Sequence, residues 1–169
     1  MSKIIIANWK MNLPILSEWN EAIKSSTPPF SQKGRGDIEI VVCPPFTHLE
    51  KVKNLLPSKV KLGAQNIFWE PRGAYTGEIS PNMLKNLGVE YIIIGHSERR
   101  HYLGETDEMI NKKVKAALGS GLKVILCVGE NLSIRRRGKK AVENFIKNQL
   151  ALDLKETKNY KLITKNLII

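Results

Sequence analysis

The stretch at residues 91–100, Tyr-Ile-Ile-Ile-Gly-His-Ser-Glu-Arg-Arg, joins an apolar run to a glycine and a series of polar residues. An apolar run without polar alternation is typical of a strand buried on both faces, as in a parallel sheet covered by helices. We therefore predict a strand over residues 91–94. Its polar continuation would lie at the carboxyl end of the strand, where such folds keep their chemistry.

Similar apolar runs recur along the whole chain and are separated by segments with helical spacing. The runs predict further strands at residues 3–7, 38–43, 60–64, 123–128 and 166–169. The helical segments lie between them: Leu16, Trp19 and Ile23; Leu49, Val52 and Leu56; residues 81–87, closed by Gly88; Ile110, Val114, Ala117 and Leu118 after an N-cap at Thr106; and Val142, Phe145, Ile146 and Leu150. This alternation predicts an α/β fold with a parallel sheet and right-handed crossovers.

The alternation fits a barrel better than a dinucleotide-binding fold. No Gly-x-Gly-x-x-Gly follows the first predicted strand, which disfavours a dinucleotide site. A closed (β/α)₈ barrel needs about 250 residues, with a lower limit of roughly 200. This chain has 169 residues and offers five complete units and the start of a sixth. We therefore predict one domain over residues 1–169, of the α/β class, with the fold of an incomplete (β/α)₈ barrel.

Composition narrows the class of protein. Apolar residues make up 42% and charged residues 25% of the chain, which is ordinary for a globular protein. No run of about 18 apolar residues exists, so we expect no membrane span, and the apolar stretch at residues 4–7 is too short for a signal peptide. We expect a cytoplasmic protein.

Cys43 and Cys127 share no metal-ligand spacing and sit in apolar runs, so we expect buried thiols in strands and no metal.

The net charge of +11 leaves one alternative open, a basic module that binds RNA or acidic partners. The densest basic run is Arg135-Arg136-Arg137-Gly138-Lys139-Lys140, and the other cations are scattered. No aromatic-interleaved groove, zinc finger or helix-turn-helix pattern accompanies the run. We interpret it as a solvated helix start and expect no nucleic-acid partner.

Polar residues that follow two predicted strands are candidates for a site. Asn8 and Lys10 come directly after the first strand, where they are either a surface turn or contacts for an anion and a carbonyl. His96 follows the strand at residues 91–94, and Gly95 lets the chain turn there. A helix start beside His96 would keep its imidazole neutral. Glu98 and Arg99 have a plain alternative as a structural ion pair.

Six stretches of the chain together resemble the triosephosphate isomerase family. They occur in the family's order and at its spacings. The stretches are Asn-Trp-Lys-Met-Asn at 8–12, Cys-Pro-Pro at 43–45, Ala-Gln-Asn at 64–66, Gly-Ala-Tyr-Thr-Gly-Glu-Ile-Ser at 73–80, Gly-His-Ser-Glu-Arg-Arg at 95–100 and Cys-Val-Gly-Glu at 127–130.

The resemblance implies a TIM barrel that interconverts dihydroxyacetone phosphate and D-glyceraldehyde 3-phosphate in glycolysis and gluconeogenesis. It implies no metal or organic cofactor. By the same resemblance, Asn8 and Lys10 bind substrate, Lys10 also stabilises transition-state charge, and His96 polarises the carbonyl. Glu98 would position the lysine. Thr76 would reach across a homodimer interface.

The chain departs from the family pattern in two places. The family's strand corresponding to residues 167–169 continues into a segment that carries the general base, followed by a mobile lid and further phosphate contacts. We therefore expect this chain alone to be inactive, with a truncated form of a longer enzyme, a non-catalytic remnant and half of a split enzyme as alternatives. The run at residues 134–138 is also more basic than is usual in the family.

Overall fold

We describe the protein in a computed structural model that covers residues 3–13, 15, 17–18, 21, 38–157 and 166–169. The predicted helix through Leu16, Trp19 and Ile23 lies outside these residues. The chain divides into two compact units, and each is described by itself. One contains Met1–Gln65 and Met83–Tyr91, and the other contains Asn66–Asn82 and Ile92–Ile169.

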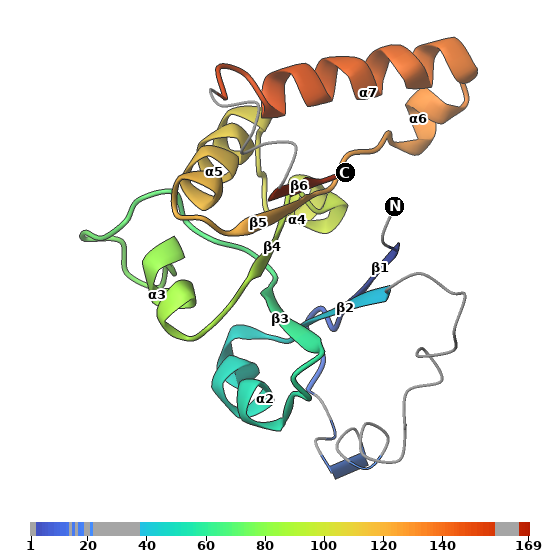
Figure 1. Ribbon diagram of the computed structural model, residues 1–169. Helices are drawn as coiled ribbons and strands as arrows, with labels where there is room; N and C mark the ends of the chain where they lie inside the picture. Colours follow the sequence, from blue (N-terminus) through green and yellow to red (C-terminus); the bar gives the residue numbers. More distant parts are fainter. Residues whose placement is uncertain (1–2, 14, 16, 19–20, 22–37, 158–165) are drawn as a thin grey trace. The chain divides into compact units, whose positions relative to one another are not determined.

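The first unit contains three parallel strands, β1 (Lys3–Asn8), β2 (Ile38–Cys43) and β3 (Val60–Ala64), in that order. Lys3 aligns with Ile38 and Asn8 with Cys43. The parallel register brings the carboxyl ends of β1 and β2 to one edge (Figure 1). The apolar runs therefore form the strands that their composition predicts.

Burial in this unit is uneven. A Cβ on Gly63 would lie 2.4 Å from Cys43 Sγ, so only glycine fits between β2 and β3 there. Cys43 is fully buried. In contrast, Ile5 of β1 is 49% exposed, although its apolar run predicted burial on both faces. Within the described part of the chain, β1 pairs with β2 alone and lies at the edge of the sheet.

Short helical segments follow β2 and β3. After β2 comes a 3₁₀ turn, η2 (Phe46–His48), and then α2 (Leu49–Leu55), which buries Leu49 and Val52. The predicted helix before residue 88 is α3 (Pro81–Asn86), and Gly88, two residues after its end, has φ of 80°. Only glycine adopts this left-handed conformation without cost, so the C-cap prediction is confirmed.

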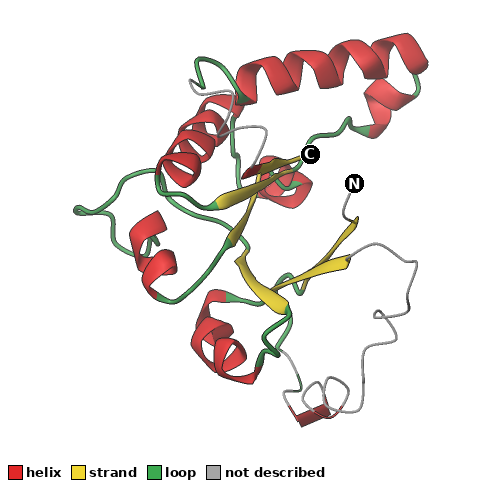
Figure 2. Cartoon of the chain, in the orientation of Figure 1, coloured by secondary structure: helices red, strands yellow, loops and turns green. Residues whose placement is uncertain are grey.

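The second unit alternates strands and helices in the predicted way (Figure 2). β4 (Tyr91–Ile94) leads to α4 (Ser97–Tyr102) and α5 (Asp107–Gly119), and β5 (Lys123–Leu126) leads to α6 (Leu132–Arg135) and α7 (Lys139–Asp153). β6 (Leu167–Ile168) pairs in parallel with β5. β5 and β6 are both shorter than the apolar runs that predicted them.

The core of this unit lies between the sheet and α5, and α7 packs on α5. β4 is buried along its whole length, as its apolar run predicted. The predicted stripe of α5, Ile110, Val114, Ala117 and Leu118, is buried as well. Thr106 caps α5 by accepting a hydrogen bond at Oγ1 from the Met109 amide at 3.3 Å, so the N-cap prediction is confirmed.

Helix α7 departs from the prediction in what it buries. Its predicted apolar stripe, Val142, Phe145, Ile146 and Leu150, is only half-buried. The two buried residues of the helix are Gln149 and Asp153. Both continue the same helical stripe, since Gln149 follows Phe145 and Ile146 at intervals of three to four residues and Asp153 follows Gln149 and Leu150 at the same intervals. The inward face of α7 is therefore partly polar.

Among the described residues, no helix combines the length and apolar character needed to cross a bilayer. The basic run before α7 is exposed from Arg135 to Lys140, in agreement with its interpretation as a solvated helix start. Cys43 and Cys127 are free thiols. Cys127 lies just beyond β5 and is half-buried, so the prediction of a buried strand thiol is correct for Cys43 only.

Candidate active site

In the first unit, the carboxyl end of β1 forms a tight polar turn. The Asn8 side chain accepts a hydrogen bond at Oδ1 from the Lys10 amide at 3.0 Å, and Asn12 Nδ2 donates to the Trp9 carbonyl at 2.9 Å. Lys10 has φ of 52°, in the left-handed region that L-residues with side chains rarely adopt. Asn8 therefore both ends the strand and holds the unusual backbone of Lys10.

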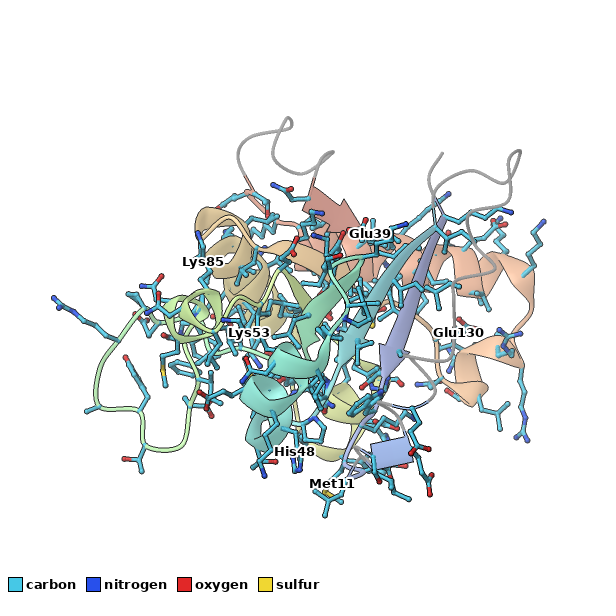
Figure 3. All side chains as sticks on the ribbon, turned by 60° about the horizontal axis from the view of Figure 1, so that its bottom comes forward. Met11, Glu39, His48, Lys53, Lys85 and Glu130 are labelled. Atoms are coloured by element: carbon cyan, nitrogen blue, oxygen red, sulfur yellow. The ribbon has the colours of Figure 1, made fainter. Side chains whose placement is uncertain are left out.

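Gln65 supports this turn from the end of β3. Its Nε2 donates to the Lys10 carbonyl at 3.0 Å and to the Cys43 carbonyl at 2.9 Å. The Trp9 amide also donates to the Cys43 carbonyl, at 3.1 Å. One amide side chain thus links the segments that follow β1 and β2. Figure 3 shows Met11 and His48 at this end of the unit, beyond the two strands.

In the second unit, His96 sits where β4 gives way to α4. Gly95 has φ of 75°, which turns the chain directly after the strand. His96 is the N-cap of α4, and its Nδ1 accepts a hydrogen bond from the Glu98 amide at 3.3 Å. An Nδ1 that accepts this bond carries no proton, so a neutral imidazole has its proton on Nε2.

Glu98 also approaches the imidazole through its carboxylate. Glu98 Oε2 lies 3.4 Å from His96 Nδ1, and the two side chains are 43% and 23% exposed. Glu98 thus reaches the same ring nitrogen with its backbone amide and with its carboxylate.

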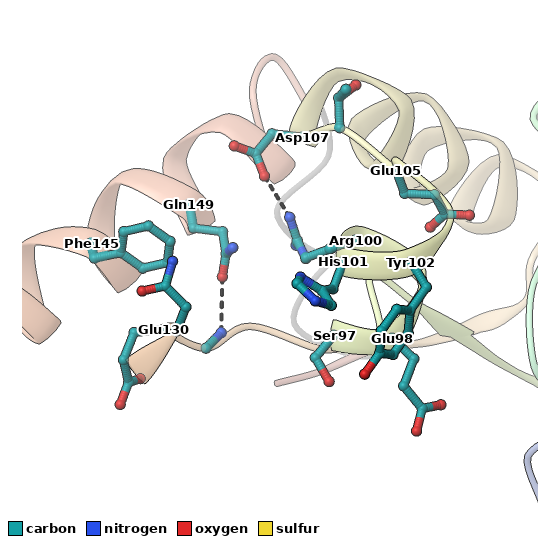
Figure 4. A pocket seen from close by; sticks show the side chains of 13 residues that line it. Ser97, Glu98, Arg100, His101, Tyr102, Glu105, Asp107, Glu130, Phe145 and Gln149 are labelled. Atoms are coloured by element: carbon teal, nitrogen blue, oxygen red, sulfur yellow. Dashed lines mark hydrogen bonds and ion pairs between the residues drawn. The ribbon is translucent and has the colours of Figure 1, made fainter. Parts of the chain in front are cut away.

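A cavity of about 360 Å³ opens beside His96. It is lined by Gly95, His96, Ser97, Arg100 and residues 127–130. A larger cavity of about 630 Å³ shares Ser97, Arg100 and Glu130 with it and extends to Phe145 and Gln149 (Figure 4). Gln149 Oε1 accepts a hydrogen bond from the Gly129 amide at 2.9 Å, which fixes the backbone after β5 against α7.

Two clusters of buried charge flank α4. In the first, Glu105 is bonded by Lys113 and by Arg99 Nε, the latter at 2.5 Å, and Lys113 Nζ also donates to Asn66 Oδ1 at 2.7 Å. Burial alone would raise the pKa of Glu105. The hydrogen bonds from Lys113 and Arg99 outweigh it and hold that pKa below its usual value. We call this set the Glu105 cluster.

In the second cluster, Arg100 lies between two carboxylates. Its Nη1 is 2.5 Å from Asp107 Oδ1, and its Nη2 is 2.6 Å from Asp153 Oδ2. Burial raises the pKa of Asp153 to about 6; Arg100 opposes the rise and the neighbouring Asp107 adds to it. We call Arg100, Asp107 and Asp153 the Asp153 cluster.

Thr76 lies in an exposed loop, residues 71–78, of the second unit. Three aromatic rings support the base of this loop. Phe68 packs against Trp69 at 4.1 Å and against Tyr75 at 4.7 Å between ring centroids. The Phe68 amide donates to the Ile79 carbonyl at 2.9 Å, which closes the loop at its ends.

The structure thus brings the predicted site residues together as two pairs, one in each unit. Asn8 and Lys10 meet in one, and His96 and Glu98 in the other. That the two pairs share one site stays a prediction, as do the roles of all four residues and of Thr76. Sequence reasoning missed the supporting bonds of Gln65 and Arg100, although both residues lie in stretches that carried the family resemblance.

The parallel βα units, with polar residues after β1 and β4, define the class of this protein: an incomplete TIM barrel of the α/β class. The profile of one family, triosephosphate isomerase, matches residues 3–169. The chain belongs to the triosephosphate isomerase family.

Curated relatives agree with this assignment. The chain is 51% identical over 154 residues to the triosephosphate isomerase of Alkaliphilus metalliredigens, covering 89% of the chain and 59% of the relative. It is 56% identical over 138 residues to that of Dictyoglomus thermophilum, covering 81% and 54%. For Natranaerobius thermophilus the identity is 46% over 165 residues, covering 93% and 61%. The chain therefore spans little more than half the length of the curated relatives that it matches.

Proposed function

We propose that residues 1–169 supply the electrophilic half of an isomerase that interconverts dihydroxyacetone phosphate and D-glyceraldehyde 3-phosphate. The observation that carries the proposal is the His96 N-cap. Because Nδ1 accepts the Glu98 amide, Nε2 of a neutral ring is left to donate a hydrogen bond to a substrate carbonyl oxygen. Such a donor polarises the carbonyl and stabilises the enediolate oxygen that forms when a neighbouring C–H loses its proton.

Lys10 and Asn8 complete the binding side of this proposal. The Lys10 ammonium supplies a point charge for the substrate phosphate and for the developing oxyanion. The left-handed backbone of Lys10 supports a functional role, since strained residues of this kind cluster at ligand sites. We assign Asn8 to substrate binding and Glu98 to positioning the lysine.

The proposal divides the catalytic groups between this chain and further residues. The family resemblance puts the general base beyond the segment that matches β6. A carbon acid loses its proton only to a base within hydrogen-bond reach. We therefore propose that a polypeptide of these 169 residues alone does not isomerise triose phosphates. We also propose that the complete enzyme is a cytoplasmic homodimer of glycolysis and gluconeogenesis, with the exposed Thr76 loop at the interface.

A chimera tests the proposal directly. Residues 1–169 are joined to the remaining residues of the relative from Alkaliphilus metalliredigens, and conversion of glyceraldehyde 3-phosphate is followed in a coupled assay. We expect turnover by the chimera and none above buffer by the 169-residue chain. Substitution of His96 by Gln should lower kcat by about 10²-fold or more, the range for loss of a positioned proton donor.

A neighbouring histidine provides the matched control. His101 lies on the same helix, α4, and is exposed, so His101→Gln should change kcat less than twofold, within the effect of an ordinary surface substitution. Robust turnover by the 169-residue chain would show that the division of groups is wrong. Full activity of the His96→Gln chimera would show that His96 is not the electrophile.

A further inference from the structure

Arg100 makes an unusual set of backbone contacts next to His96. From α4 its Nε donates to the Gly95 carbonyl at 2.8 Å, and its Nη2 donates to the Cys127 carbonyl at 3.3 Å. Gly95 is the last residue before His96, and Cys127 follows β5. One guanidinium therefore joins the carboxyl ends of two strands of the second unit.

Two carboxylates from different helices hold the guanidinium in place. Asp107 is the first residue of α5 and Asp153 the last of α7. Both accept from Arg100, and the Asp153 side chain is completely buried. A planar guanidinium with these four partners is held in one orientation, because four of its five N–H donors point at different segments of the chain.

The Gly95 backbone lies so close to the Arg100 guanidinium and the Cys127 carbonyl that there is no room for a side chain at this position. A Cβ on Gly95 would lie 2.9 Å from Arg100 Nη2 and 3.0 Å from the Cys127 carbonyl oxygen. The side chain of Arg100 thus packs directly on the main chain of the residue that precedes His96.

We infer that Arg100 is a positioning residue for His96: held by Asp107 and Asp153, its fork ties the Gly95 carbonyl to the Cys127 carbonyl and so fixes the imidazole as the N-cap of α4. The importance of this role for catalysis rests on the proposed function. The contacts that position the imidazole do not depend on that function. Lysine cannot replace it, because a single ammonium cannot meet two carbonyls and two carboxylates in one plane.

Nuclear magnetic resonance of the full 169-residue chain tests the inference without substrate. The ¹⁵N shifts of the imidazoles report the tautomer of each histidine, and exchange of the Glu98 amide reports the bond that His96 Nδ1 accepts. In Arg100→Lys we expect His96 to change from one tautomer to a mixture. The Glu98 amide should exchange about tenfold faster, as a bond that opens locally does.

The chain offers matched controls. Arg99→Lys changes the neighbouring arginine, whose side chain bonds Glu105, and should leave both readouts as in the wild type. His48 and His101 serve as internal references. The Met109 amide, bonded to Thr106, reports whether α5 keeps its start.

The outcomes separate the possibilities. An unchanged His96 tautomer and an unchanged Glu98 exchange rate in folded Arg100→Lys would overturn the inference, and so would an equal change in Arg99→Lys. If Arg100→Lys does not fold, Asp107→Asn keeps Arg100 and removes one of its anchors, so a smaller change in the same direction is expected and no change overturns the inference. If the chimera is inactive but Arg100→Lys changes the His96 tautomer and the Glu98 exchange rate as expected, the proposed function is wrong and the positioning role of Arg100 is supported.

Discussion

The two neighbouring arginines of α4, Arg99 and Arg100, belong to two buried clusters in which the pKa of a carboxylate shifts in opposite directions. In the Glu105 cluster, one carboxylate faces two cations, Lys113 and Arg99, and its pKa is lowered. In the Asp153 cluster, two carboxylates share one cation, and the pKa of Asp153 is raised to about 6. Burial acts in the same direction on both acids. The ratio of cations to acids therefore decides whether burial or pairing dominates.

The largest expected effect comes from removing a cation from the Glu105 cluster. Lys113→Met leaves Asn66 Oδ1 without this donor and Glu105 with Arg99 alone. Breaking a buried ion pair in this way costs about 3–5 kcal/mol of unfolding free energy. Denaturant unfolding measures it. The exposed neighbour Lys112, paired with Glu108 at 2.9 Å, is the control, and Lys112→Met should cost less than about 1 kcal/mol. Equal costs would mean that the burial of Lys113 has no energetic consequence.

The pH dependence of stability distinguishes the two acids. The pKa of Asp153 rises from 3.8 to about 6 on folding, so between these values the folded chain holds more protons than the unfolded one. Stability from this group therefore falls as pH rises through that window, by about 3 kcal/mol for a shift of about two pH units. Asp153→Asn removes the titration. Its unfolding free energy relative to wild type should increase by about that amount from pH 4 to pH 7.

Glu105→Gln should give the opposite slope. The pKa of Glu105 is lowered on folding from 4.5, so its stabilising effect is present above that value and is lost as pH falls through the folded pKa. Relative to wild type, Glu105→Gln should lose stability as pH rises from the acid range. Urea unfolding at a series of pH values gives both slopes. Slopes of the same sign would refute the contrast between the clusters.

Two glycines sharpen the comparison with a smaller effect. Gly95 and Gly104 have similar left-handed backbones, with φ of 75° and 67°. Among the described residues, a Cβ on Gly104 meets nothing within 4 Å, whereas one on Gly95 meets Arg100 and the Cys127 carbonyl. Gly104→Ala should cost about 1 kcal/mol for the backbone alone, and Gly95→Ala about 1–2 kcal/mol more because of the overlap. Similar midpoints for the two variants in thermal unfolding would show that the Arg100 guanidinium moves at little cost to make room for the alanine methyl group.

The smallest expected effect lies between the clusters. Thr106 separates Glu105 from Asp107 in the chain and caps α5. Thr106→Ala should cost about 1 kcal/mol, the usual loss for an N-cap hydroxyl. Thr106→Ser keeps the oxygen and should remain within a few tenths of a kcal/mol of the wild type. A loss in the serine variant equal to that in alanine would assign the effect to the Thr106 methyl group rather than to the cap.

Sequence reasoning predicted the local features of this molecule well. Continuous apolar runs placed β2, β3 and β4, a hydroxyl before two acids placed the start of α5, and Gly88 marked the end of α3. Each of these depends on neighbours in the chain. His96 at the start of α4 belongs to the same group, because its cap bond spans two residues.

The supporting bonds could not be predicted in the same way, because they join distant segments. Arg100 and Asp153 are 53 residues apart, and Gln65 and Lys10 are 55 apart. Nothing local in the sequence marks Gln65 as the brace of a turn after another strand. For α7 a signal did exist, since Gln149 and Asp153 continue its apolar stripe. A buried polar residue on such a stripe indicates a hydrogen-bonded partner elsewhere in the fold.

The left-handed backbone of Lys10 has a consequence for protein engineering. Glycine would adopt φ of 52° freely, whereas lysine carries a conformational cost of roughly 1–2 kcal/mol at that position. Selection for thermostability alone would therefore tend to replace this lysine, and a library screened only for surviving heat would drift away from the ammonium group that we assign to substrate binding. Screens of this chain need a ligand-dependent step, because selection for stability alone will enrich variants that are more stable but have lost the substrate-binding ammonium group.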